Sequence, residues 1–326
     1  MRQRWEHRLR QNTGTLTEHY LQNVYPSNAD FENLFINSAI FANQELADAI
    51  HKLANGQKLV QDELVIAFRT GNHIPSFDNL EKYTKNLPEQ KYEGLVNILN
   101  NVWDIFSYNY GAIVDDFALI TKGQTSQPLP ENVIVSGKEN LFIAEGAKIY
   151  DGCIINATVG PVYIGKGAEI LEGSMMRGPL AICDQAVVKM GAKLYGATTI
   201  GPSCKVGGEI NNVVFFANSN KAHDGYLGNA IIGEWCNLGA DTNCSNLKNN
   251  YDEVQIWDEH YNKTIKTGLT FCGLLMGDHS KCSINTMFNT GTVVGVSCNI
   301  FGHGFPEKFV PSFCWGGSEG MSTYDF

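Results

Sequence analysis

One histidine has a sequence context that suits proton-transfer chemistry. His223 lies in the segment NSNKAHDGYLG, which is rich in Gly, Asp and Asn and has few apolar residues. Histidine suits proton transfer in neutral water because its unperturbed pKa is ~6.5. The composition therefore predicts an exposed loop from which His223 could act as a general base. The alternative is a surface histidine whose imidazole caps a turn.

Two further histidines have less suggestive contexts. His279, in GDHSKC, is predicted to lie at a corner of the repeat described below, either in a site or satisfying backbone groups. His303 lies between two glycines and is expected to be structural. These histidines show no short HxxxxH spacing, which argues against a zinc site of the γ-type carbonic anhydrase kind, and we expect no metal site.

A six-residue repeat predicts the elements that must position these residues. From Ile164 to Val206 every sixth residue is apolar, and the residue four positions later is mostly small. The pattern also occurs upstream from Ile143 and returns at Ile232 and Met276. Each hexad is typical of one strand and one corner of a triangular solenoid, which is stabilised by stacking of its coils. A series of β-hairpins would instead alternate with period two.

Two intervals between apolar hexad positions predict loops. Each exceeds a whole number of hexads by two residues, and we interpret the extra residues as excursions near 212–226 and 245–268. Loops on a rigid scaffold are where function concentrates. The first excursion would carry His223.

The chain before residue 130 lacks the repeat and favours an α/β domain. NQELADAIHKLANG, from Asn43, has apolar residues at helical spacing. NLFINSAIF and KLVQDELVIAFRTG predict strands on either side, and YEGLVNILNNVWDIFSYNYGAIVDDF predicts a helix that breaks near its aromatic residues. No Gly-rich phosphate loop precedes Trp5, so the expected nucleotide-binding domain is incomplete.

Several segments resemble a known family. KAHDGYLGNAIIGEWCNLGADTNCSN resembles the acetyltransferase half of the bifunctional N-acetylglucosamine-1-phosphate uridyltransferase/glucosamine-1-phosphate acetyltransferase, GlmU. EGSMMRGPLAICDQAVVKMGAKLYGATTIGPSCKVGGEINNVVFF and MGDHSKCSINTMFNTGTVVGVSCNIFGHGFP resemble more closely the GlmU-like sugar nucleotidyltransferases of Bacteroidetes-type bacteria. The resemblance covers essentially the whole chain and is most specific over 160–305.

The resemblance implies three regions. Residues 1–130 would form an incomplete α/β nucleotidyltransferase-like domain, residues 131–305 a left-handed parallel β-helix of hexapeptide repeats, and residues 306–326 a C-terminal extension. The left-handed coiling is taken from the resemblance, since the spacing of the hexads does not determine it.

The resemblance also implies functional residues. His223 falls on the family's general base. Lys221 lies one residue away from a phosphate-binding lysine, and Lys205 is the nearest cation where the family has a phosphate-binding arginine. Asn37 stands where an aspartate would help to hold Mg²⁺. The implied substrate-binding candidates are Lys205, Lys221, Tyr226, Asn237, Asn246 and His279.

The implied activity is acyl transfer from acetyl-CoA to an amino-sugar phosphate or a nucleotide sugar, in a homotrimer. Alternatives are a sugar-1-phosphate nucleotidyltransferase in a longer gene product, which would need Mg²⁺, and a non-catalytic nucleotide-sugar-binding scaffold. Because the phosphate loop is lacking and Asn37 replaces an aspartate, we expect no nucleotidyl transfer by this chain. For Asn246, the alternative is a ladder of stacked amides with Asn243, Asn285 and Asn289.

Composition narrows the class of protein further. The net charge is −10 and the pI about 5.3, without a Lys/Arg run, which argues against nucleic-acid binding. MRQRWEHRLRQ lacks an apolar signal-peptide core, and no apolar run approaches the ~18 residues of a membrane span. The nine cysteines form no CxxC pair and indicate reduced thiols. The sequence predicts a soluble, cytoplasmic protein.

Overall fold

The computed structural model describes residues 1–27, 32–74 and 76–324. The chain forms two compact units, Met1–Asn100 and Asn101–Phe326. The boundary lies about thirty residues before the predicted one near residue 130, because the segment after Asn100 packs with the solenoid. No helix in the described part of the chain is long and apolar enough to cross a membrane.

The first unit is a small α/β body with a four-stranded sheet in the order β1-β3-β2-β4. Asn43 caps the predicted helix, since its side-chain oxygen accepts the Leu46 amide at 2.8 Å. The long helix expected from Tyr92 was wrong in its first part, where Ile98 instead forms a β-bridge with Ile40. The elements are α1 (Arg2–Leu9), β1 (Asn33–Ile36), α2 (Gln44–His51), β2 (Lys58–Gln61), β3 (Leu64–Thr70), η1 (Phe77–Asn79), α3 (Leu80–Thr84) and β4 (Glu89–Lys91).

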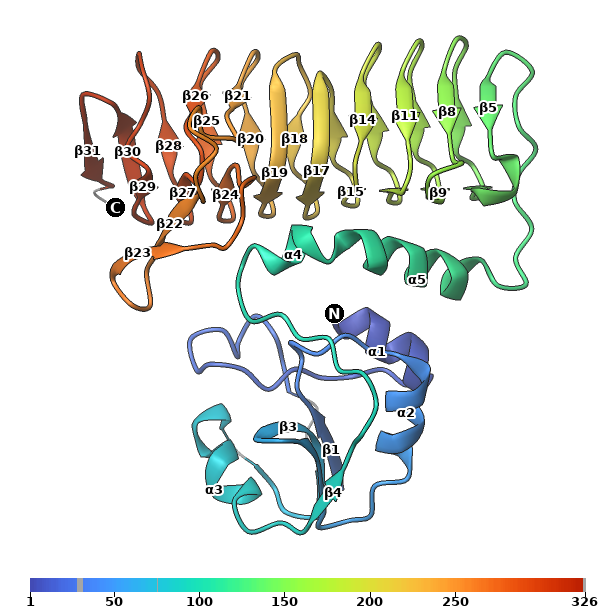
Figure 1. Ribbon diagram of the computed structural model, residues 1–326, viewed down its shortest axis with the longest axis vertical. Helices are drawn as coiled ribbons and strands as arrows, with labels where there is room; N and C mark the ends of the chain where they lie inside the picture. The colour runs from blue at the N-terminus through green and yellow to red at the C-terminus, as the bar shows by residue number, and fades with distance from the viewer. Residues whose placement is uncertain (28–31, 75, 325–326) are drawn as a thin grey trace. The chain divides into compact units, whose positions relative to one another are not determined.

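The second unit is built on a parallel β-helix, as the hexads predicted (Figure 1). Each coil contributes one short strand to each of three faces, and the chain passes from the first face to the second and the third. The apolar hexad residues point inside and form one continuous core, in which Ile164, Ile182 and Ile200 are completely buried. Stacking of the coils therefore accounts for most of the apolar burial in this unit.

The first face is the ten-stranded sheet, closed at its end by an antiparallel strand. Its strands are β7 (Lys148–Ile149), β10 (Glu169–Ile170), β13 (Val187–Val188), β16 (Lys205–Val206), β18 (Asn220–Lys221), β20 (Asn237–Leu238), β25 (Lys281–Cys282), β28 (Asn299–Ile300), β30 (Cys314–Gly317) and the antiparallel β31 (Gly320–Thr323). Because β30 extends the stack past residue 306, the predicted C-terminal extension was wrong, and this part of the chain belongs to the solenoid.

The second and third faces share two long strands that run across the corner between them, β17 (Glu209–Phe215) and β19 (Tyr226–Ile232). The second face also contains β5 (Ile134–Ser136), β8 (Ile154–Asn156), β11 (Met175–Arg177), β14 (Lys193–Tyr195), β21 (Asn243–Cys244) and β26 (Met287–Phe288). The third face also contains β6 (Leu141–Ile143), which follows the turn η2 (Lys138–Asn140), β9 (Val162–Ile164), β12 (Leu180–Ile182), β15 (Thr198–Ile200), β24 (Leu275–Met276), β27 (Val293–Val294) and β29 (Phe309–Val310).

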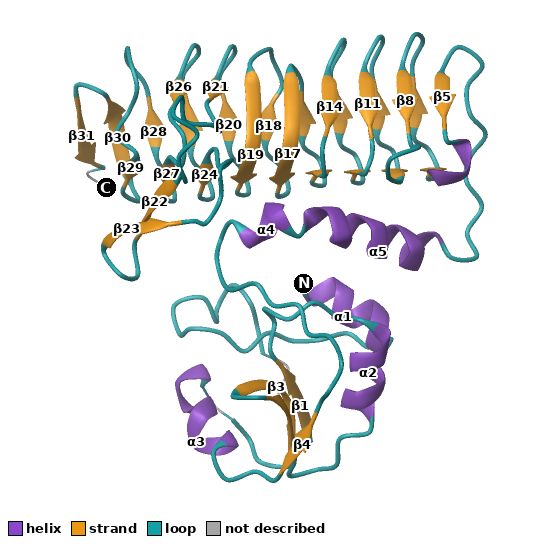
Figure 2. Ribbon diagram, in the orientation of Figure 1, coloured by secondary structure: helices purple, strands orange, loops and turns teal. Residues whose placement is uncertain are grey.

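The third face is covered within the chain (Figure 2). Helices α4 (Asp104–Ser107) and α5 (Asn109–Thr121) run along it, and the hairpin of β22 (Gln255–Asp258) and β23 (Lys263–Lys266) packs beside them. Asn109 anchors α5, because its amide donates to the Ala197 carbonyl at 2.6 Å.

The two predicted excursions have different outcomes. The chain leaves the coil after β21 and forms the β22–β23 hairpin, so the excursion near 245–268 is confirmed. The excursion near 212–226 was wrong, because this segment forms β17 and β18 and enters β19 within the parallel stack. The register shifts here because the coils are shorter than three hexads.

Candidate functional site

A notch in one corner of the solenoid creates the groove that holds His223. Between β16 and β17 the corner from the first to the second face consists of Gly207 and Gly208 alone. On the flanking coils the same corner spans residues 189–192 and 222–225. The glycine corner is therefore two residues shorter than its neighbours, which leaves a recess between them.

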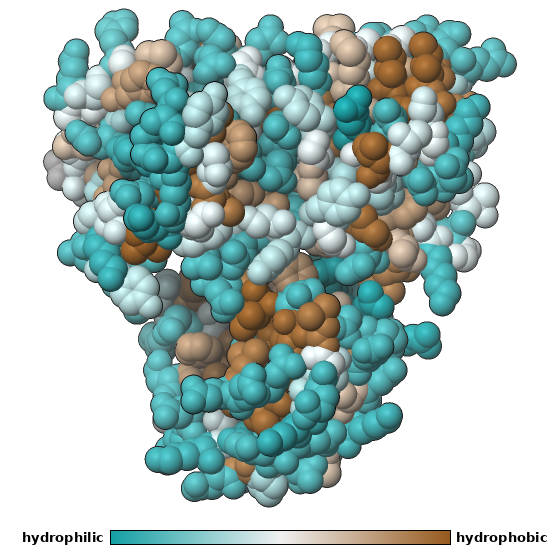
Figure 3. All heavy atoms as spheres, in the orientation of Figure 1, coloured by the Kyte–Doolittle hydropathy of each residue, from teal (hydrophilic) through white to brown (hydrophobic). Residues whose placement is uncertain are grey.

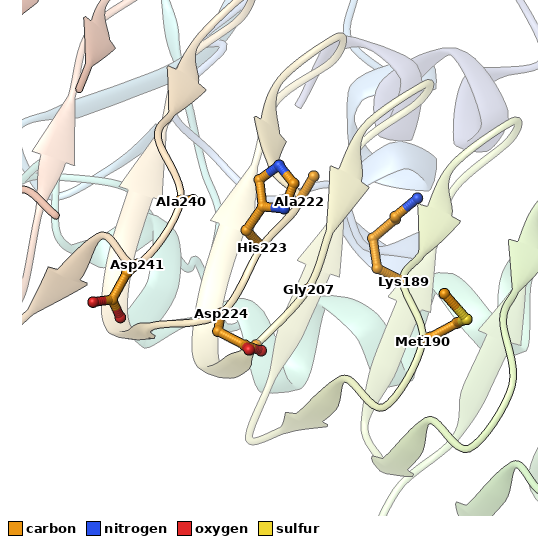
Figure 4. A pocket seen from close by; sticks show the side chains of 9 residues that line it. Lys189, Met190, Gly207, Ala222, His223, Asp224, Ala240 and Asp241 are labelled. Atoms are coloured by element: carbon orange, nitrogen blue, oxygen red, sulfur yellow. The ribbon is translucent and has the colours of Figure 1, made fainter. Parts of the chain in front are cut away.

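The recess is a groove of about 540 Å³ that runs across successive coils. Lys189 and Met190 form one side and the two glycines the floor. His223 and Asp224 form the other side, with Asp241 beyond them on the next coil (Figure 4). The groove thus carries a cation, two carboxylates and an exposed imidazole over backbone.

Lys221 does not line this groove, contrary to the role suggested by the resemblance. Its side chain is completely buried inside the solenoid, where it follows Val206 in the stack of the first face. Its Nζ donates to the carbonyl oxygens of His223 at 2.8 Å and Asp224 at 3.0 Å. Burial lowers the pKa of Lys221 to about 8, against the opposing effect of the Asp224 and Asp241 carboxylates and Cys282.

This shifted pKa predicts a pH-dependent stability. Below pH 8 Lys221 is protonated in both the folded and the unfolded chain, so the burial penalty is fully present. Between pH 8 and 10.5 the folded chain loses this proton and the unfolded chain retains it, so stability increases with pH. We expect the wild type to gain roughly 3 kcal/mol relative to Lys221→Met across this window. Urea denaturation of both proteins at fixed protein concentration, from pH 7 to 10.5, measures the difference; parallel curves would contradict the expectation.

Tyr226 and Asn246 come together on the second face. The Asn246 amide donates to the Tyr226 hydroxyl at 3.0 Å and to the Asn229 side-chain oxygen at 2.8 Å. The Asn229 side-chain amide in turn donates to the Asn212 side-chain oxygen at 3.0 Å. Asn246 therefore belongs to an amide ladder. Its partners are Asn229 and Asn212, whereas the alternative interpretation of the sequence expected Asn243, Asn285 and Asn289.

Lys205 and Asn237 lie on the first face rather than in the groove. Both are exposed, and each pairs with Asn220, which lies between them in the sheet. The corner that carries His223 separates this face from the second face with Tyr226. Lys205 and Asn237 therefore lie on one side of this corner, and Tyr226 and Asn246 lie on the other.

His279 lies at another corner, between the third and the first face. Its imidazole is stacked on Trp235 of the preceding coil, with 6.2 Å between ring centroids. Both residues have a positive φ of 60°, which is uncommon for side chains of this size. The corner position predicted for His279 is confirmed, but the structure does not bring it into the groove.

Sequence reasoning missed Lys189, Asp224 and Asp241 as groove residues. A signal for them existed, because each comes within three residues after an inward-facing hexad position of the first face. Residues at equal distances after aligned hexads share a corner. Among the residues that the structure describes, no group of three or more His, Cys, Asp or Glu side chains is placed to hold a metal ion.

Comparison with known proteins adds to this geometry. Residues 1–125 match a family described as "Sugar nucleotidyl transferase". The chain is 29% identical over 208 residues to the "Bifunctional protein GlmU" of Methanocaldococcus jannaschii, which covers 64% of this chain and 44% of that protein. It is 27% identical over 252 residues to the "Bifunctional sugar-1-phosphate nucleotidylyltransferase/acetyltransferase" of Sulfurisphaera tokodaii, with 77% and 56% covered.

The chain therefore spans about half the length of these relatives. Among solved structures, the polySia specific acetyltransferase NeuO is similar over 59% of this chain and 85% of that one, with 13% identity and a TM-score of 0.31. The N-terminal match and the bifunctional relatives together cover both units of the structure. The chain is thus similar to bifunctional GlmU-type proteins, with a region that matches the sugar nucleotidyl transferase family ahead of a parallel β-helix of hexapeptide repeats.

Proposed function

We propose that the solenoid transfers an acyl group from a CoA thioester to the amine of an amino-sugar phosphate or a nucleotide-linked amino sugar. The observation that carries this proposal is the groove at the glycine corner, where His223 is exposed over backbone. The acetyltransferase in the names of relatives supports the same reaction class. Acetyl-CoA is the proposed donor.

The chemistry requires a base and a stabilised oxyanion. The amine attacks the thioester carbonyl while His223 accepts its proton, and the C–S bond then breaks as CoA leaves with a proton. Backbone N–H groups at the corner could stabilise the oxyanion. Lys189 offers a cation for a phosphate, whereas Asp224 and Asp241 would attract an ammonium group before it is deprotonated.

The polar groups on the adjacent faces suit the remainder of the two substrates. Tyr226 and Asn246 on one face, and Lys205 and Asn237 on the other, offer hydroxyl, amide and ammonium groups for a sugar phosphate or a nucleotide. Substrate binding by these four residues is part of the proposal.

The test measures CoA release from acetyl-CoA with two acceptor panels, amino-sugar 1-phosphates and nucleotide-linked amino sugars. The proposal expects enzyme-dependent release with at least one acceptor. If no acceptor in either panel is turned over, the non-catalytic scaffold replaces the acyltransferase as the function of the solenoid. Use of acyl-CoA would fit a cytoplasmic location, which belongs to the same proposal.

We also propose a homotrimer, in which substrates are held between neighbouring solenoids. The second face carries a row of exposed apolar side chains in register, Ile134, Ile154 and Met175, exposed by 63%, 42% and 45% (Figure 3). Covering this row would remove apolar surface from water. Light scattering at micromolar concentration should give about three times the chain mass of 36.0 kDa. A strictly monomeric mass would contradict the trimer and the shared site.

The N-terminal match favours nucleotidyl transfer as a second candidate function, for the first unit. Such a reaction would use Mg²⁺ and a phosphate cradle. Asn37, at the position where the resemblance implies a metal-binding aspartate, has its side-chain oxygen engaged with the Ala39 amide at 3.0 Å. Pyrophosphate release from nucleoside triphosphates with sugar 1-phosphates and Mg²⁺ is the assay: robust, enzyme-dependent release would establish this second function and overturn the expectation from the sequence that this chain does not transfer a nucleotidyl group.

A further inference from the structure

We infer that Lys221 is a positioning residue, whose ammonium group holds the bend 222–225, and with it His223, against the groove from inside the solenoid. The inference rests on the proposed function, because positioning matters only if His223 acts on a substrate. Lys221 itself is completely buried and cannot touch a bound substrate.

The position of Lys221 in the stack is the first argument. Along the first face, the inward residues are Ile149, Ile170, Val188, Val206, Lys221, Leu238, Cys282 and Ile300. Lys221 is therefore a charged residue in an otherwise apolar row, where a buried ammonium is unfavourable unless it is hydrogen-bonded. A local conflict of this kind is expected where a residue serves function rather than packing.

The contacts of the ammonium group are the second argument. Nζ donates to the backbone oxygens of His223 and Asp224 at 2.8 and 3.0 Å, and these two residues form one side of the groove. Their side chains are exposed, so the apolar core does not hold the bend. Hydrogen bonds with a charged donor are stronger than neutral ones. Lys221 thus ties an exposed bend to a rigid core.

Backbone hydrogen bonds to the adjacent coil hold the two ends of the bend, so only its middle depends on Lys221. The Gly207 amide donates to the Lys221 oxygen at 2.7 Å, and the Glu209 amide donates to the Gly225 oxygen at 3.1 Å. These bonds fix where the bend begins and ends. The two Lys221 contacts fix its middle, where His223 lies, and so set the direction of the imidazole.

The experiment compares Lys221→Met with Leu238→Met, a matched change at the next inward position of the same row. The methionine at 221 keeps the length of the side chain but removes the ammonium and its two bonds. We expect kcat for CoA release to fall ~10- to 100-fold, since small displacements of a catalytic group have effects of this size, with KM within threefold. Leu238→Met should leave kcat unchanged.

Hydrogen exchange of the Glu209 amide provides a readout that needs no activity. It should become faster in Lys221→Met than in Leu238→Met, because loss of the two contacts at the middle of the bend also loosens the adjoining Gly225 oxygen, to which this amide bonds. Unchanged exchange, or unchanged kcat in an active protein, would overturn the positioning role, as would a loss of kcat that follows general unfolding. If the wild type lacks turnover, the proposed function fails, whereas faster exchange would still demonstrate the tether.

Discussion

Replacing His223 with alanine should reduce kcat for CoA release ~10²- to 10⁴-fold, the usual effect of removing a general base. The side chain is exposed at the groove and belongs to no hexad position, so the solenoid does not depend on it for packing. We expect the free energy of unfolding to change by less than about 0.5 kcal/mol. Steady-state kinetics with the acceptor found in the panels, together with urea denaturation, separates the two effects.

His303→Ala is the matched control, because it removes another exposed histidine far along the stack near β28. It should retain wild-type kcat. Tyr226→Phe and Asn246→Ala should act mainly through KM, as expected for groups that bind substrate without taking its proton. If His223→Ala matches the wild type within threefold, His223 is a surface residue, and His279 becomes the base to test.

The hexad pattern was sufficient to predict the solenoid but not the site within it. Apolar residues at every sixth position require one inward side chain for each strand, and this requirement holds from Ile143 to Ile300. A break in the register of the hexads shows only how many residues remain after whole hexads are counted. The sequence therefore cannot distinguish residues added to a coil from residues deleted from it. Both register breaks were therefore interpreted as insertions, whereas the one near His223 comes from shortened coils.

Most residues of the candidate site lie where the sequence departs from the hexad pattern. The resemblance implied Lys221 as a phosphate ligand, yet its place after Val206 in the stack puts its side chain inside the solenoid. Asn246 joins an amide ladder through Asn229, a contact across two coils that no linear pattern specifies. The helix α5 belongs with the solenoid because Asn109 hydrogen-bonds to Ala197, an interaction between distant parts of the sequence.

The glycine corner itself should be the most sensitive backbone position of the groove. Gly208 has a φ of +73°, and a Cβ there would lie 2.6 Å from the Gly225 oxygen and 3.0 Å from the Asp224 Cα. Neither contact can be relieved by rotating a side chain, because both involve backbone atoms. We expect Gly208→Ala to lower the free energy of unfolding by roughly 2–4 kcal/mol, from the left-handed backbone and the clash together. Any folded fraction should have the bend 222–225 displaced and kcat reduced.

Gly191→Ala separates the penalty of the left-handed backbone from the steric clash, because Gly191 lies at the same corner on the coil before the notch. Gly191 has a φ of +66°, but a Cβ there meets nothing within 4 Å, so only the backbone penalty of about 1–2 kcal/mol applies. The difference between the two variants in urea denaturation measures the clash with the bend. Gly191→Ala should keep its kcat, because the bend that carries His223 is untouched. Equal destabilisation by both substitutions would show that the bend yields to the new methyl group, and that the notch is not the tight contact on which the groove depends.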